Sequence, residues 1–193
     1  MVGVIVLALL LFVVVGVILY FVSIYNGLIR LSRNIEKTWA NIDVLLKQRH
    51  DEIPKLVKVC EGYMKYERET LEKITAARTA CVEARTVGDS AKAEGDLSRA
   101  LKTLFAVAEN YPDLKASQNF NQLQQRISYL ESQIADRREF YNDSVNNYNI
   151  RINQLPDMFV AQMLQMKPKD MDKRKDAGRH RSTTPRPHRE GRG

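Results

Sequence analysis

The sequence predicts an all-α protein: an N-terminal transmembrane helix, an up-and-down-like bundle of four long helices, and a disordered C-terminal tail. Three observations predict this class. The chain begins with a long uncharged apolar run, its middle repeats apolar residues at helical spacing, and its end is basic and poor in apolar residues. No stretch alternates in the manner of a strand. We expect the anchor over 1–26, the bundle over 27–158 and the tail over 159–193.

The N-terminal segment from Val2 to Ile24 is apolar except for Ser23 and two glycines. As a helix it is about 34 Å long, which is enough to cross a hydrocarbon layer of about 30 Å. A cleaved signal peptide or a buried core helix are the alternatives. A signal peptide has a basic start, a shorter apolar run and a small-residue cleavage site, and these features are missing here. The pattern favours a retained transmembrane anchor.

Basic residues follow the anchor and none precedes it. Arg30, Arg33 and Lys37 are offset only by Glu36. The positive-inside rule therefore predicts that the bundle lies in the cytoplasm. Tyr20 and Tyr25 are the aromatic residues expected at the membrane–water interface on that side.

The first bundle helix carries an apolar stripe that starts at Leu28 and runs in steps of three and four as far as Cys81. Pro54 interrupts it without shifting its phase, so we predict one long helix kinked at Pro54. Two helices meeting there, with Asp51 as N-cap, remain the alternative. On one helix Cys60 and Cys81 are about 30 Å apart, too far for a disulfide, and both are interpreted as small buried hydrophobes.

Two further helices follow. Gly88 is the predicted stop, with Asp89 or Ser90 as the next N-cap, and Pro112 ends the shorter helix that results. Asp113 is the expected cap of its successor. The last helix has the cleanest period in the chain, with apolar or aromatic residues in near-heptad spacing at Phe120, Leu123, Ile127, Leu130, Ile134, Tyr141, Val145, Tyr148, Ile152 and Leu155.

Several long motifs resemble those of the LemA family, a group of bacterial membrane-anchored helical proteins. They are "YNGLIRL", "WANIDVLLKQRHDEIPKLVKVCEGY", "ETLEKITAARTA" and "ENYPDLKASQNFNQLQQRISYLESQIADRREFYNDSVNNYNIRINQLP". The resemblance covers about residues 20–160. It implies a helical bundle behind one transmembrane helix in the bacterial inner membrane, and it implies no defined chemistry. The segment "LPDMFVAQMLQMKPKD" departs from the small apolar and aromatic end common in the family.

No catalytic motif is present: the sequence contains no phosphate-binding glycine loop, nucleophile elbow or H-E-x-x-H pair. The run "RHDE" at 49–52 does not converge on one ion, because adjacent helical residues point about 100° apart. The sequence therefore predicts no enzyme activity, no metal site and no cofactor.

Arg49 and Arg138 (or its neighbour Arg137) fall where the apolar stripes expect a core residue. One interpretation is that their stems lie on the core and their charged ends reach water. The other is a buried polar layer across the bundle. The candidate acceptors for that layer are Asp43, Asp51, Glu131, Asp136 and Asp143.

Two segments, 39–43 and 139–149, are dense in Asn, Tyr and Trp. Asparagine is a poor residue for a helix interior, which indicates a local reason for its presence. Exposed amides beside a core of Trp39, Tyr141 and Tyr148 would be one reason. A docking face for a protein partner is the other, and its members would be Asn41, Asp43, Asn142, Asp143 and Asn149.

Most of the net charge of +7 lies in the tail. Its basic residues from 173 onward are Lys173, Arg174, Lys175, Arg179, Arg181, Arg186, Arg189 and Arg192. A solvated tail, contact with anionic lipid, or unspecific polyanion binding all fit this composition, and no specific nucleic-acid site is expected. The predicted function is an interaction or scaffold module on the membrane; the alternative is a polyanion-binding or anionic-lipid-binding protein that acts through its tail.

Overall fold

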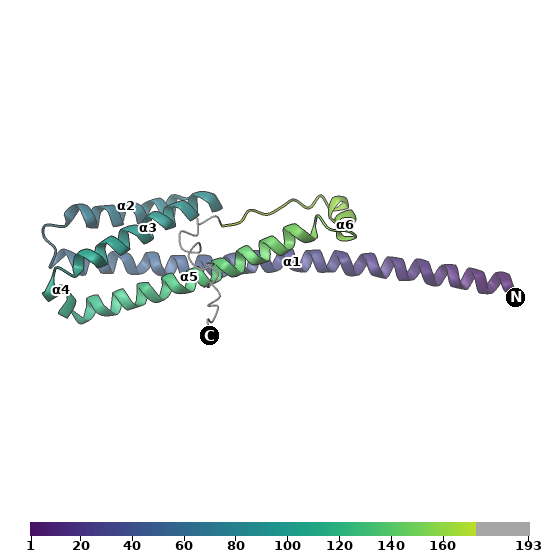
Figure 1. Ribbon diagram of the computed structural model, residues 1–193, viewed down its shortest axis with the longest axis horizontal. Coiled ribbons are helices and arrows are strands. Elements are labelled where there is room, and N and C mark those ends of the chain that lie inside the picture. The colour runs from purple at the N-terminus through teal and green to yellow at the C-terminus, as the bar shows by residue number, and fades with distance from the viewer. Residues whose placement is uncertain (173–193) are drawn as a thin grey trace, which may run out of the picture.

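The computed structural model describes residues 1–172, which are mainly helical and contain no strand. The helices are α1 (Val2–Glu61), α2 (Arg68–Glu83), α3 (Val87–Ala108), α4 (Pro112–Ala116), α5 (Gln118–Arg151) and α6 (Asp157–Met163). Figure 1 shows α1, α2, α3 and α5 side by side, with successive long helices running in opposite directions. The all-α prediction is confirmed. The basic residues from Lys173 onward lie outside the described part of the chain.

The first third of α1 extends beyond the bundle (Figure 1). Its best 18-residue window has a mean hydropathy of 3.4 and no buried residue, and Ile24 is the first side chain that the bundle covers. Over residues 1–172 this is the one helix long and apolar enough to cross a membrane. An apolar surface of this size is stable in lipid rather than in water.

The prediction of one helix from Leu28 to Cys81 is wrong. α1 ends at Glu61, the chain reverses over residues 62–67, and α2 returns along α1. Met64 is buried in the turn and closes the end of the core. The apolar stripe does not reveal this reversal, because both helices of a hairpin present their apolar residues to the same core. Cys60 and Cys81 therefore lie on different helices, and both are buried free thiols.

α1 passes through Pro54 without ending, so the alternative of two helices meeting there is also wrong. Proline has no N–H, and the carbonyl of His50, four residues earlier, loses its helical donor. Arg78 of α2 supplies the replacement: its Nε donates to the His50 carbonyl oxygen at 2.8 Å. The bend at Pro54 stays a prediction, but the His50 carbonyl that the proline leaves without a helical donor has a partner in α2.

The predicted caps also need correction. Gly88 does not stop a helix; it lies in the first turn of α3, whose N-cap is Thr86. The Thr86 hydroxyl accepts the Asp89 N–H at 3.0 Å and donates to the Asp89 carboxylate at 2.7 Å. Asp113 lies in the short helix α4, and Ser117 caps α5 instead. In each case a threonine or serine hydroxyl in extended backbone caps the helix in place of the predicted residue.

Helix lengths divide the bundle into two halves. α5 has 34 residues and is about 51 Å long, whereas α3 has 22 and is about 33 Å long. The α2–α3 hairpin therefore covers only the half of the bundle that lies farther from the anchor. The core of this half, which we call the distal core, includes Ile53 of α1, Leu104 of α3 and Ile127 of α5. The proximal core, next to the anchor, is built from α1 and α5 and completed by α6 and by Met166 and Met171.

Residues 166–172, which we call the strap, are extended and run back from α6 along α5 (Figure 1). The strap occupies the position over the proximal half that the α2–α3 hairpin is too short to reach. The tail predicted to begin at 159 thus differs from the structure, since α6 and the strap pack on the bundle as far as Asp172. Apolar residues at Val160, Met166 and Met171 account for the difference.

Candidate functional site

Two asparagines of α5 hold the main chain of the strap. Asn149 donates its amide N–H to the Lys169 carbonyl at 2.9 Å and accepts the Lys169 N–H at 2.9 Å. Asn142 makes the same pair of bonds to Asp172, at 3.1 Å and 2.8 Å. Each amide therefore satisfies both main-chain polar groups of one strap residue, much as a neighbouring strand would.

Two tyrosines of α5 also bind the main chain of the strap, as donors only. The Tyr148 hydroxyl donates to the Lys167 carbonyl at 3.4 Å, and the Tyr141 hydroxyl donates to the Asp170 carbonyl at 3.1 Å. Burial raises the pKa of both phenols, and for Tyr141 the nearby Asp172 and Asp170 raise the pKa further. Both hydroxyls therefore stay protonated and remain donors at neutral pH.

The ends of this contact are charged. Arg138 of α5 pairs with Asp172 at 2.9 Å, and both side chains are almost fully buried. Lys169 lies with its Nζ 5.7 Å from the centre of the Tyr148 ring, 3.5 Å from the Glu36 carboxylate and 3.4 Å from the Ser32 carbonyl. We call this set of α1 and α5 groups the strap site. It consists of Ser32, Glu36, Arg138, Tyr141, Asn142, Tyr148 and Asn149.

A second polar cluster separates the two cores. Arg49 has no exposed surface and forms ion pairs with Glu94 of α3 and Glu131 of α5. The Ser98 hydroxyl lies 2.9 Å from Glu131 Oε1, and it also accepts a bond from Arg49 at 3.2 Å. Burial lowers the pKa of Arg49, and Glu131 opposes that shift. The guanidinium thus joins α1, α3 and α5 at the boundary between the distal and the proximal core.

His50 stands beside this cluster, with its Nε2 2.8 Å from Glu94. Burial, followed by the charges of Arg49 and Arg78, lowers the pKa of His50 to about 4. The imidazole is therefore neutral at physiological pH. Burial also raises the pKa of Cys81, and it raises that of Cys60 to about 12, so both thiols stay protonated and unreactive.

The ligand atoms of His50, Cys81 and Glu94 lie within 4.8 Å of one another. They border a cleft of about 500 Å³ between α1, α2 and α3, which Arg78 also lines. The spacing is short enough for a metal ion, but Glu94 already pairs with Arg49. Two guanidinium groups beside the three donors oppose the approach of a further cation.

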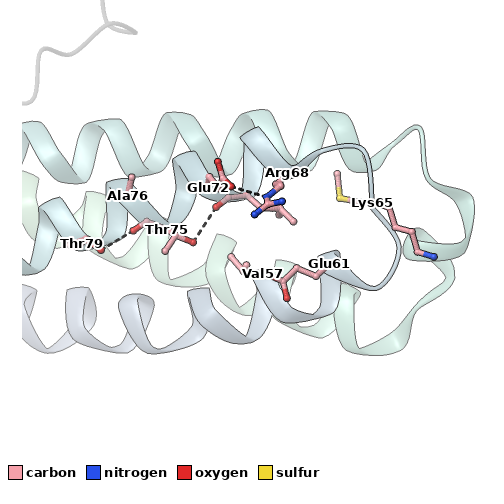
Figure 2. Close-up of a pocket in the computed structure, with 10 residues that line it drawn as sticks. Val57, Glu61, Lys65, Arg68, Glu72, Thr75, Ala76 and Thr79 are labelled. Atoms are coloured by element: carbon pink, nitrogen blue, oxygen red, sulfur yellow. Dashed lines mark hydrogen bonds and ion pairs between the residues drawn. The ribbon is translucent and has the colours of Figure 1, made fainter.

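A larger cleft, of about 610 Å³, lies between the end of α1 and the start of α2 (Figure 2). The polar groups that α2 contributes to this cleft form their interactions within α2 itself. Arg68 pairs with Glu72 at 3.0 Å, and the hydroxyls of Thr75 and Thr79 bond to carbonyls four residues earlier. These groups stabilise the helix and do not converge on a common point.

The structure separates the residues of the predicted docking face. Asn142 and Asn149 come together on the strap, whereas Asn41, Asp43 and Asp143 are exposed, and Asp43 lines the cleft beside His50. Trp39 and Tyr141 lie against each other with ring centres 5.2 Å apart. The docking face therefore stays a prediction, now limited to Asn142 and Asn149.

The candidate polar layer is also divided. Arg138 is buried, and its neighbour Arg137 is exposed. Arg49 pairs with Glu131, which was among the expected acceptors. The other expected acceptors are exposed: Asp43, Asp51, Asp136 and Asp143. Sequence reasoning missed Glu94 and Asp172. A usable signal existed for the strap site, because the pair Tyr-Asn occurs twice in α5, at 141–142 and 148–149, seven residues apart.

Together, the apolar projecting helix and the helical bundle behind it define the class of membrane-anchored helical proteins. The LemA family matches residues 38–184, and the chain belongs to the LemA family. The chain is 32% identical to Protein LemA of Metamycoplasma hominis over 161 residues, which cover 77% of this chain and 69% of that protein.

Magnetosome proteins are further relatives. Magnetosome protein MamQ 1 of Paramagnetospirillum magneticum is 25% identical over 180 residues, and Magnetosome protein MamQ of Magnetospirillum gryphiswaldense is 22% identical over the same length. These alignments cover 80% of this chain and 66% of each relative. The chain therefore spans about two thirds of the length of the magnetosome proteins that it matches.

Proposed function

We propose that this protein is a membrane-anchored scaffold that binds a partner protein through the proximal half of its bundle, with no catalytic role. The carrying observation is the strap site, where two asparagine amides satisfy the main-chain groups of Lys169 and Asp172. Groups arranged in this way bind an extended chain as a strand edge does, and main-chain bonds supply affinity without requiring one particular sequence.

The anchor supports this role. An apolar helix that continues into the bundle holds the strap site close to the membrane, where partners that are also bound to the membrane are concentrated. The basic residues Arg30, Arg33 and Lys37 at the end of the anchor support a cytoplasmic bundle.

Pull-down of partners from membranes tests the docking role. The full chain carrying Asn142→Ala and Asn149→Ala is compared with a matched variant carrying Asn146→Ala and Asn147→Ala, two exposed asparagines of the same helix. We expect a partner to be lost with the first pair and retained with the second. Equal capture by both variants would remove the strap site from the proposal.

Protease access tests the orientation. Intact spheroplasts that express the chain with an epitope after Gly193 are treated with trypsin, which cleaves the chain after Lys and Arg and so removes an accessible epitope. We expect protection until lysis. Cleavage in intact spheroplasts would place the bundle outside the cytoplasm and move the search for partners to the cell envelope.

A further inference from the structure

We infer that the strap site recognises an extended peptide of one pattern: a basic residue, any residue, an apolar residue and an acidic residue. The chain's own segment Lys169–Asp172 is the resident occupant, and a segment of a partner protein with the same pattern replaces it. This inference rests on the proposed docking function and names the class of partner.

The spacing of the contacts matches a helix to an extended chain. Seven residues along α5 advance about 10.5 Å, and three residues of extended chain advance about 10 Å. Tyr141 and Tyr148 accordingly bind Asp170 and Lys167, and Asn142 and Asn149 bind Asp172 and Lys169. Each heptad of α5 therefore contacts three residues of main chain, and this match does not depend on the identity of the side chains.

The side chains of the strap add the selectivity. Asp172 is 2% exposed and faces Arg138, so an acidic residue at this position satisfies a buried cation. Lys169, three residues earlier, lies between Glu36 and the ring of Tyr148, both of which favour a cation. Met171 packs against the proximal core. A basic and an acidic group three residues apart, with an apolar residue before the acid, is the pattern that fits.

The remaining strap positions are permissive. Lys167, Pro168 and Asp170 are exposed, so their side chains do not determine the fit. Proline at 168 suits the site, because its ring favours extended backbone and the α5 side chains bind the N–H groups of Lys169 and Asp172 instead. A partner segment therefore needs to match at three positions only.

The connection to α6 allows the strap to leave its site while α6 stays folded. Gln165, which joins α6 to the strap, has φ of 51°, the left-handed conformation that commonly ends a helix, and the Met166 N–H bonds back to the Ala161 carbonyl at 2.9 Å. The strap itself has no regular secondary structure and is held by side chains of α1 and α5. Residues 167–172 can therefore leave the site without breaking a backbone hydrogen bond of any helix.

Binding of a synthetic peptide tests the inference directly. The probe is a fluorescent peptide with the sequence of residues 166–172, added to the full chain in detergent. The chain is used as wild type and with Lys169→Ala and Asp172→Ala, which weaken the resident strap. We expect the strap variant to bind the probe at least about tenfold more tightly than wild type, because the site is free for a larger fraction of the time.

Two matched controls accompany the measurement. A peptide with the residues at positions 169 and 172 exchanged keeps the composition and reverses the charges. Adding Asn142→Ala and Asn149→Ala to the strap variant removes the main-chain contacts. We expect neither the exchanged peptide nor the asparagine variant to bind.

Each contrary result has a distinct meaning. Equal binding of the exchanged peptide overturns the sequence pattern and leaves the main-chain docking function standing. Failure of the probe to bind a strap variant that still melts cooperatively overturns the inference that another segment replaces the strap. Loss of partner capture without any probe binding separates the two proposals in the same way.

A second measurement uses the wild-type chain, in case the strap variant does not fold. The N–H groups of Lys169 and Asp172 are protected by Asn149 and Asn142. Excess probe should accelerate hydrogen exchange at these two amides and leave exchange in the distal core unchanged. Unchanged exchange at both amides with probe in excess would overturn the inference.

Discussion

Pro54 and Arg78 illustrate how single residues set the local structure. The proline removes the donor for the His50 carbonyl, and the arginine of the facing helix supplies another at 2.8 Å. The helix therefore keeps a proline in its interior at a lower cost than an isolated helix would. The same contact ties α2 to α1 next to the buried cluster of Arg49.

Arg78→Met should lower the free energy of unfolding by about 1–2 kcal/mol, because the His50 carbonyl is left without a donor. In a Pro54→Ala background the loss should be smaller, since the alanine N–H then bonds to that carbonyl. Thermal or denaturant unfolding of the four proteins in detergent measures this coupling. Identical losses in the two backgrounds would disprove the link between these residues.

His50 should make stability depend on pH. Its pKa is about 4 in the folded chain and near 6.5 when unfolded, so the unfolded state binds more protons between these values. Stability is therefore full above about pH 6.5 and falls as the pH drops towards 4, by up to about 3 kcal/mol. Melting curves from pH 7 to 5 measure the effect. His50→Gln should flatten this dependence, and an unchanged slope in that variant would assign it to other groups.

At the scale of elements, the buried cluster fixes how α1, α3 and α5 meet. Arg49 pairs with one carboxylate from each of the other two helices, and a shift of one helix by a turn would separate the charges. Buried charges that lose their partners are costly, which disfavours other registers.

Arg49→Leu should therefore reduce the free energy of unfolding by about 3–5 kcal/mol, because the buried Glu94 loses its guanidinium partner. Arg137→Leu is the matched control, since Arg137 is exposed, and its effect should stay within about 0.5 kcal/mol. Denaturant unfolding compares the two. A stability of Arg49→Leu equal to that of the control would show that a leucine fills the position as well as the ion cluster does.

The whole molecule has three parts: the anchor, a distal half of the bundle whose core the α2–α3 hairpin covers, and a proximal half whose core is completed by α6 and the strap. Met166 and Met171 of the strap complete the proximal core, and its Asp172 pairs with the buried Arg138. The half that the α2–α3 hairpin covers and the half that the strap covers are thus separate, and the strap lies on the half next to the projecting helix.

Two truncations test this division. Removal of residues 173–193 should leave the melting temperature unchanged, since those residues lie beyond the strap. Removal of 164–193 should lower it by about 4 °C or more, because Met166 and Met171 leave the proximal core and Arg138 loses Asp172. Equal melting of both truncated chains would show that the strap contributes no stability.

The helical class, the anchor and most of the positions that face the core could be predicted from the sequence, because helical periodicity and hydropathy are local properties of neighbouring residues. The sequence also marked Arg49 and Arg138 as exceptions in the stripe. Three features could not be predicted from the sequence: the reversal at 62–67, the pairing of Arg49 with Glu94, and the contacts of Asp172 with Arg138 and Asn142. These features depend on which distant segments meet, and a stripe of apolar residues looks the same whichever helix it faces.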